Sequence, residues 1–182
     1  HNAYTSNDLT NYYIKVPKRH AKLAYGILAD MMRHPILDEI EVDRERTVVV
    51  EEMNVWRDDP AHAVYDLLPQ ILWPYDPLGR ESIGTKEVIT SISRDDIYDF
   101  QQLHYGPENI VVSVAGDVEH ESVVGHIVDL MGDMKRHKVQ KITKLDTRYN
   151  DQKVIAVEQE TKQAHLLIGC RAYAYNKKLE PA

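Results

Sequence analysis

The chain has 182 residues, of which 43% are apolar, and a formal net charge of −7 at pH 7. This length allows one ordinary domain, or one domain and part of another, and the apolar content excludes a disordered chain. The acidic balance argues against a nucleic-acid-binding surface, and no apolar stretch approaches the roughly 18 residues of a membrane span. The single cysteine, Cys170, excludes an intrachain disulfide, and we expect it to be a buried structural thiol.

The sequence begins with a predicted strand pair and an amphipathic helix. Residues 4–16 are rich in β-branched and aromatic side chains, and turn-forming residues at 6–8 interrupt them, which favours two antiparallel strands. Pro17 ends the second strand. Residues 19–32 carry apolar side chains at helical spacing, so we predict a helix there. The apolar side chains that share one face of this helix are Leu23, Ala24, Ile27, Leu28 and Met31.

A second helix is predicted from about residue 38 to about residue 57. It contains Glu45 and Glu52, whose separation of seven residues is close to two helical turns and places both carboxylates on one face. A helical wheel puts them in a stripe that we expect to be buried. The apolar members of this stripe are Val42, Val48, Val49, Met53 and Trp56. A buried carboxylate needs an arginine, a capped amide or a metal as partner, and the spacing alone leaves these alternatives open.

Beyond this helix the chain alternates helices and loops and includes one apolar strand. Pro69 should kink or shorten the next helix, and Ser93–Asp96 has the pattern of a capping box. A continuous β-branched run is typical of a central strand. The elements predicted here are a helix at 61–72, a loop at 73–80, a helix at 97–105, a strand at 110–115 and a helix at 119–131.

The composition changes after the last of these helices. Residues 135–151 are basic and polar, which indicates an interdomain linker; a nucleic-acid-binding patch is the weaker interpretation because the whole chain is acidic. Two more strands are predicted at 154–157 and 164–172. We therefore divide the chain into a portion of a first domain (1–134), the linker, and the opening strands of a second domain (152–182).

The remaining candidate sites are weak. None of the nine histidines forms an i, i+4 pair with another, and we expect His120 and His126 to be surface residues. The sequence contains no G-x-S-x-G, P-loop or G-x-G-x-x-G motif. Cys170 lies in a predicted strand without a nearby histidine, which argues against a thiol nucleophile.

Several short motifs follow one another in a characteristic order between residues 2 and 134. They are Asn2-Ala3-Tyr4-Thr5-Ser6; Arg44-Glu45-Arg46 leading to Glu51-Glu52-Met53; Pro77-Leu78-Gly79-Arg80 with Ile83-Gly84; Ile92-Ser93-Arg94-Asp95-Asp96; and Tyr105-Gly106-Pro107-Glu108-Asn109 running into Val114-Ala115-Gly116-Asp117. With these motifs the chain resembles the pitrilysin/mitochondrial-processing-peptidase family of zinc peptidases, also called inverzincins. Residues 152–173 are similar to the opening strands of the second, homologous domain of that family.

The resemblance implies a site and a role for each of its residues. In this family, two histidines of an inverted H-x-x-E-H motif and a later glutamate hold zinc. Glu52 matches that glutamate, and Glu45 matches a second acid that supports the site. The residues Asn2, Ala3, Tyr4 and Thr5 match the edge strand that binds peptide substrate by strand addition. Zinc would activate a water molecule, and the H-x-x-E-H glutamate would act as general base.

The sequence departs from the family pattern because the H-x-x-E-H motif is absent and would lie upstream of Asn2. We therefore expect this fragment to bind zinc poorly and to be inactive. The parent protein is expected to be a zinc metalloendopeptidase that hydrolyses peptides or unfolded segments, with a second homologous domain or subunit as partner. The alternative is a noncatalytic structural or partner subunit of the same family.

The expected fold class is α+β, a two-layer arrangement of a mostly antiparallel sheet with helices packed on one face, of the LuxS/processing-peptidase type. Without a membrane span, we expect a soluble protein of the cytoplasm or of an organelle matrix.

Overall fold

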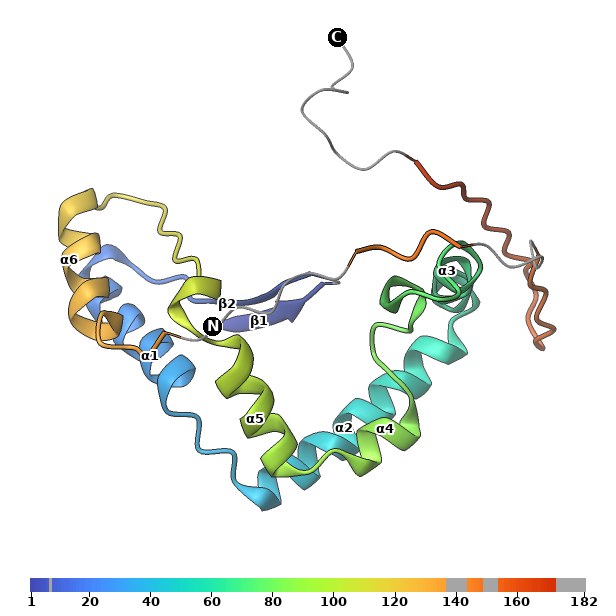
Figure 1. The fold of residues 1–182 in the computed structure, drawn as a ribbon, viewed down its shortest axis with the longest axis horizontal. Helices are drawn as coiled ribbons and strands as arrows, with labels where there is room; N and C mark the ends of the chain where they lie inside the picture. The colour runs from blue at the N-terminus through green and yellow to red at the C-terminus, as the bar shows by residue number, and fades with distance from the viewer. Residues whose placement is uncertain (7, 137–143, 149–153, 173–182) are drawn as a thin grey trace, which may run out of the picture. The chain divides into compact units, whose positions relative to one another are not determined.

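A computed structural model gives the fold of the chain (Figure 1). It describes residues 1–6, 8–136, 144–148 and 154–172. The chain divides into two compact units, of which the first comprises His1–Arg46 and Ser91–Ile142 and the second comprises Thr47–Thr90 and Thr143–Ala182. Three parts of the predicted chain lie outside the described residues. They are most of the predicted linker (137–143 and 149–151), Asn7 of the predicted turn, and residues 152–153 and 173–182 of the predicted second domain.

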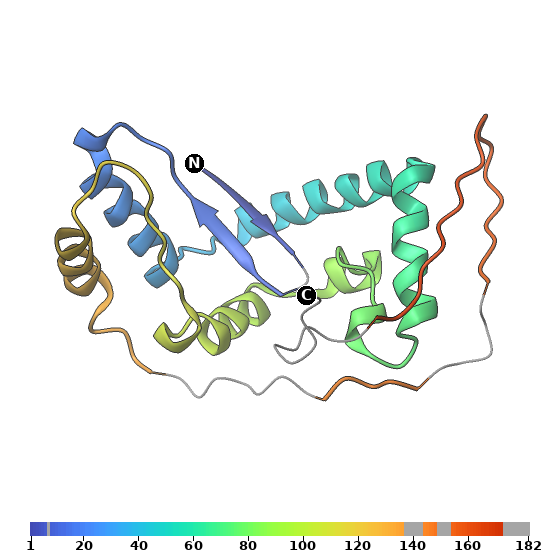
Figure 2. The ribbon, with the colours of Figure 1, turned by 90° about the horizontal axis from the view of Figure 1, so that it is seen from above.

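The first unit begins with the predicted strand pair. Strands β1 (Asn2–Thr5) and β2 (Thr10–Tyr13) are antiparallel, as the opposed arrows in Figure 2 show. The facing pairs are Asn2 with Tyr13, Ala3 with Tyr12, Tyr4 with Asn11 and Thr5 with Thr10. The Ser6 amide donates to the Leu9 carbonyl at 2.8 Å and closes the hairpin. The prediction of an antiparallel pair is therefore confirmed.

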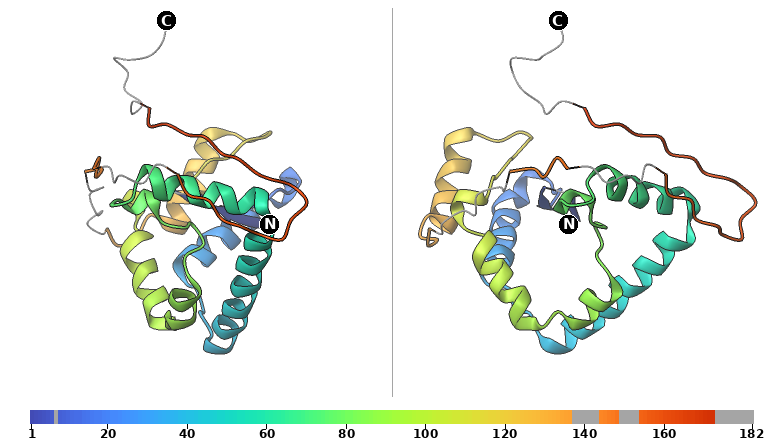
Figure 3. Two further views of the ribbon diagram at one scale, coloured as in Figure 1. Left: turned by 90° about the vertical axis from the view of Figure 1, so that its right-hand side faces the viewer. Right: turned by 45° about the vertical axis from the view of Figure 1, so that its right-hand side comes forward.

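Two helices of the first unit, α1 (Ala21–Arg33) and α6 (His120–Met131), lie side by side (Figures 1 and 3). Arg33, at the end of α1, donates to the Leu130 carbonyl and pairs with Asp133 at 2.9 Å. Both helices were predicted, but the predicted face of α1 is only partly correct: Ala24 is buried and Leu28 is half-buried. The buried side chains are Ala24, Tyr25 and Ala29, whereas Leu23, Ile27 and Met31 are exposed. The small alanines face the neighbouring structure because they allow close packing.

Helix α5 (Arg94–His104) begins with the predicted capping box. The Ser93 hydroxyl accepts from the Asp96 amide, and the Asp96 carboxylate accepts from the Ser93 amide at 2.8 Å. Two side chains tie α5 to the end of α1 and the segment after it. Arg94 donates to the Leu37 carbonyl at 3.1 Å, and Gln101 donates to the Met32 carbonyl at 2.7 Å.

The second unit contains α3 (Pro60–Leu72), the short 3₁₀ helix η2 (Pro77–Gly79) and most of α4 (Lys86–Ser91). Asp59 caps α3 by accepting from the Ala61 amide at 2.9 Å. Pro69 lies inside α3, which ends at Leu72, three residues later. The first unit also contains two 3₁₀ helices, η1 (Lys18–His20) and η3 (Pro107–Asn109).

The prediction of three further strands is wrong for the residues that the structure describes. Residues 110–115, 154–157 and 164–172 form no strand ladder there. Ile110 has extended backbone angles and the Val111 side chain is 93% exposed. β-branched composition favours an extended backbone, but a strand also needs a hydrogen-bonded neighbour. The described chain thus combines helices with one antiparallel strand pair.

Two further expectations concern the burial of the single thiol and the presence of a membrane-spanning helix. Cys170 is exposed, so the prediction of a buried thiol is wrong. Among the described residues, no helix is both long enough and apolar enough to cross a membrane.

Candidate functional site

The first candidate element is the outer edge of β1. In an antiparallel pair, hydrogen-bonded and non-hydrogen-bonded residue pairs alternate. The bonded pair of Ser6 and Leu9 fixes this alternation. The N–H and C=O groups of Asn2 and Tyr4 therefore face β2, and those of Ala3 and Thr5 point away from it. These outward groups are the type of surface that an added peptide strand can pair with.

The side chain of Asn2 closes part of this edge. Its Oδ1 atom accepts a hydrogen bond from the Ala3 amide at 2.8 Å. A backbone donor that faces outward is thus paired with a local carboxamide, which imitates the carbonyl of a neighbouring strand. All four residues of β1 are exposed, so this contact can exchange with another acceptor.

The second candidate element is α2 (Glu39–Asp58), which carries Glu45 and Glu52. Both side chains are exposed, so the prediction that they lie in a buried stripe is wrong. Within the described residues neither carboxylate forms an ion pair. The arginines of this helix have other acidic partners, because Arg44 pairs with Glu41 and Arg46 pairs with Asp43.

The reason lies in the rotation of α2 about its axis. Met53 is only 1% exposed and marks the centre of the buried side. Since each helical residue turns by about 100°, Glu52 lies about 100° and Glu45 about 80° from Met53. The side chains that are half-buried or buried are Val42, Arg46, Val49, Val50 and Met53, whereas Val48 and Trp56 are exposed. The two glutamates still share a face, but it is a flank that solvent reaches.

Metal binding needs more ligands than these glutamates supply. In the part of the chain that the structure describes, no group of three or more His, Cys, Asp or Glu side chains could hold a metal ion. These residues alone therefore do not fit a zinc site. Glu52 offers an accessible carboxylate that can serve as a single ligand.

His126, predicted on the surface, is half-buried against Tyr25, and its Nε2 atom is buried without a hydrogen-bond partner among the described residues.

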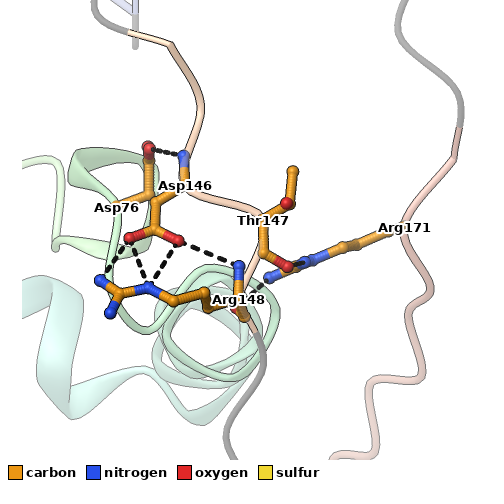
Figure 4. Close-up of polar contacts among 5 residues, drawn as sticks. All are labelled: Asp76, Asp146, Thr147, Arg148 and Arg171. Atoms are coloured by element: carbon orange, nitrogen blue, oxygen red, sulfur yellow. Dashed lines mark hydrogen bonds and ion pairs between the residues drawn. The ribbon is translucent and has the colours of Figure 1, made fainter.

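An arginine centre in the second unit was not anticipated from the sequence. Arg171 donates from Nη1 to the Thr147 carbonyl at 2.6 Å and from Nη2 to the Arg148 carbonyl at 3.1 Å (Figure 4). Its Nε also donates to the Leu72 carbonyl at 2.6 Å. Its guanidinium also lies over the Trp73 ring, 4.1 Å from the centroid. Leu72 is the last residue of α3, where helical carbonyls lack partners, so Arg171 acts as a cap.

The same centre includes two aspartates and a second arginine. Arg148 makes a forked contact with Asp146, with Nη2–Oδ2 at 2.6 Å and Nε at 3.0 Å from both oxygens. The hydrogen bonds from the Arg148 side chain, and after them the one from the Arg148 amide, lower the pKa of Asp146 to about 2. The Asp146 amide donates to Asp76 at 2.8 Å (Figure 4). Three segments far apart in sequence thus meet through polar groups, which no local sequence pattern reveals.

Comparison with known proteins identifies the class of protein. Residues 1–86 match the family model described as Insulinase (Peptidase family M16), and residues 91–182 match the one described as Peptidase M16 inactive domain. The chain is 34% identical over 168 residues to the uncharacterized zinc protease YmxG of Bacillus subtilis (strain 168), a match that covers 92% of this chain and 40% of that protein. It is 31% identical over 175 residues to the human mitochondrial-processing peptidase subunit beta, covering 96% of this chain and 36% of that subunit.

Solved structures give the same result. A protease from Helicobacter pylori superposes with a TM-score of 0.73 at 29% identity, over 83% of this chain and 37% of that one. The first half of the periplasmic protease PqqL from Escherichia coli shares the fold, with a TM-score of 0.70 at 24% identity over 81% of this chain and 32% of that one. The chain belongs to peptidase family M16, which confirms the resemblance seen in its motifs. It spans less than half of the length of these relatives: 40% of YmxG and 36% of the human subunit.

Proposed function

We propose that this chain is part of a zinc-dependent metalloendopeptidase that hydrolyses peptides or unfolded segments. Its membership in a peptidase family with relatives named zinc proteases supports this class of reaction. The observation that carries the proposal within the chain is the outer edge of β1, where the main-chain groups of Ala3 and Thr5 point away from β2.

Substrate would bind to this edge by strand addition. An extended peptide would accept from the amides of Ala3 and Thr5 and donate to their carbonyls, while Asn2 releases the Ala3 amide. Main-chain pairing of this kind accepts many side chains, which suits an enzyme that acts on peptides or unfolded segments. Tyr4 belongs to the same strand, and its side chain, on one face of the hairpin, would contribute to the substrate surface.

Glu52 would supply one carboxylate to a zinc ion whose other ligands come from outside this sequence. Glu45, on the same flank of α2, would act as the supporting acid. A bound zinc ion would supply Lewis-acid activation of water and of the scissile carbonyl. On its own, this chain is expected to be inactive and to bind zinc weakly, because a single carboxylate is not a zinc site.

We also propose a domain division at the basic linker 135–151. The family models meet between residues 86 and 91, but α5 and α6 belong to the same compact unit as the hairpin. Residues 1–134 would form part of the first domain, and residues 152–182 would open a second homologous domain that acts as its partner. In the whole domain, the hairpin would belong to a larger antiparallel sheet in a two-layer fold. The helices would pack on the face of the sheet that carries the Tyr12 side chain.

Substitution of the glutamates in the full-length protein tests this function. Glu52→Gln removes the proposed ligand with little change in shape, and Glu51→Gln is the matched control because Glu51 is exposed on the same helix. Zinc content by elemental analysis and hydrolysis of a quenched fluorogenic peptide are the two measurements. We expect Glu52→Gln to lose bound zinc and activity, and Glu45→Gln to lose roughly 10–100-fold in either.

Two outcomes would contradict the proposal. If Glu52→Gln retains zinc and activity at the level of Glu51→Gln, the carboxylate is not a ligand. If the unsubstituted protein neither binds zinc nor cleaves any peptide, the noncatalytic partner subunit becomes the better interpretation.

A further inference from the structure

Tyr12 belongs to β2, the strand that pairs with the inner side of the candidate substrate strand β1. It lies directly opposite Ala3 in the register of the hairpin. The alternation set by Ser6 and Leu9 makes this a non-hydrogen-bonded pair, in which the two Cα atoms approach most closely, to about 4.5 Å, and both side chains point to the same face. A shift of Tyr12 is therefore transmitted directly to the position of Ala3.

The Tyr12 side chain contacts Tyr105, the residue at the end of α5. The two phenol oxygens are 3.0 Å apart, and the ring centroids are 6.4 Å apart. Both side chains are half-buried. Burial and the hydrogen bond with Tyr105 raise the pKa of Tyr12, so its hydroxyl stays protonated across the neutral range.

Tyr105 is itself a fixed point. It is the C-cap residue of α5, and its amide donates to the Gln101 carbonyl at 2.9 Å. Helix α5 is secured at its start by the Ser93 capping box, and Gln101 attaches it to the Met32 carbonyl at the end of α1. The next residue, Gly106, is buried. A path of short contacts thus runs from the helices of the first unit to the middle of β1.

Among the residues that the structure describes, the opposite face of the hairpin has no such anchor. Tyr4 and Tyr13 meet there edge to face, with centroids 6.4 Å apart, and they are 52% and 46% exposed. Asn11 donates to the Tyr4 hydroxyl at 3.1 Å, but this bond stays within the hairpin. Tyr12 and Tyr13 are therefore adjacent tyrosines of one strand that differ in attachment to α5.

We propose that Tyr12 and Tyr105 are positioning residues that hold the outer edge of β1 in place for an extended peptide. This inference rests on the proposed role of β1 as the substrate strand. Neither hydroxyl would touch the substrate, since Tyr12 lies across the hairpin from the outer edge of β1. Loss of the hydroxyl pair would weaken peptide binding and leave the hydrolytic step unchanged.

The test uses the full-length protein with Tyr12→Phe, Tyr105→Phe and both together, and Tyr13→Phe is the matched control. With a quenched fluorogenic peptide, we expect each single variant to raise KM by roughly 2- to 13-fold, the range for one hydrogen bond, at nearly constant kcat. The double variant should resemble either single variant, because the two hydroxyls form one bond. Tyr13→Phe should leave KM unchanged.

A second measurement separates this inference from the proposed function. Hydrogen exchange of the Tyr4 amide, which faces β2, is followed without any substrate. Faster exchange in Tyr12→Phe and Tyr105→Phe, but not in Tyr13→Phe, would support the anchor even if no peptide is cleaved. Unchanged exchange would overturn the anchor. Faster exchange with unchanged KM, or a fall in kcat alone, would overturn the link to substrate binding.

Discussion

Replacement of Gly79 by alanine tests the loop that follows α3. A Cβ atom at Gly79 would lie 2.1 Å from the Trp73 carbonyl oxygen and 3.2 Å from the Pro69 carbonyl oxygen. Both neighbours are backbone atoms at the end of α3, so neither can move aside like a flexible side chain. Gly79→Ala must displace the loop after α3 and weaken the 2.9 Å hydrogen bond from the Gly79 amide to the Asp76 carbonyl.

The magnitude follows from three contributions. Overpacking costs about 1–3 kcal/mol, and a weakened backbone hydrogen bond adds about 1 kcal/mol. Alanine restricts the unfolded chain and returns about 0.4–1 kcal/mol. The net expectation is a loss of about 2 kcal/mol, or roughly 8–16 °C in Tm if the second unit unfolds as a body of its own size.

Gly125 in α6 provides the matched control. It is exposed, and a Cβ atom there would meet nothing within 4 Å. Because glycine is the poorer helix former, Gly125→Ala should stabilise the protein by about 0.5–1 kcal/mol. The same chemical change is therefore expected to have opposite signs at the two positions.

Urea and thermal unfolding of the two variants would decide the matter. Tryptophan fluorescence reports on the second unit, since Trp56 and Trp73 both lie in it, and far-UV circular dichroism reports on helix content throughout. A Gly79→Ala variant as stable as the unsubstituted protein would refute the close approach. Equal destabilisation by Gly125→Ala would show that the effect is not crowding at Gly79.

Three other substitutions test the polar contacts. Arg171→Lys should destabilise the second unit by roughly 1–3 kcal/mol in urea unfolding, because an ammonium group cannot reproduce the fork that reaches three carbonyls. Asp146→Asn should remove an acid-sensitive contribution to unfolding: the Asp146 pKa of about 2 is below its unfolded value, so its stabilisation exists above about pH 4 and is lost as pH falls towards 2. If the variant and the unsubstituted protein lose stability equally between pH 4 and pH 2, the Asp146 carboxylate does not contribute to acid sensitivity. Ser93→Ala should cost about 1 kcal/mol by removing the cap of α5, measurable as a lower Tm, whereas no change would mean that the capping box adds nothing.

Local signals in the sequence determined much of the fold. Turn chemistry at residues 6–8 and the capping box at Ser93 act over a few residues, so the hairpin and α5 could be predicted. Helix α2 was predicted within a residue or two at each end. The β-branched run at 110–115 misled, because pairing depends on a second segment that composition does not specify.

The candidate site was less accessible to sequence reasoning. The wheel for α2 gave every apolar residue equal weight, whereas packing turned Met53 inward and left Val48 and Trp56 exposed. The direction of Glu45 and Glu52 depends on that choice, which tertiary contacts make. The contacts of Arg171 were also hidden, since they join segments about 24 and 99 residues away.

The two proposed functional elements share one physical design. The groups proposed to bind peptide or metal are exposed, and each is oriented by a less exposed neighbour. Met53, adjacent to Glu52, fixes the rotation of α2 about its axis, and Tyr12, paired with Ala3, fixes the outer edge of β1. A binding group loses little affinity to reorganisation when its support is already rigid. The supporting residues, not only the groups they orient, are therefore where substitutions should separate binding from chemistry.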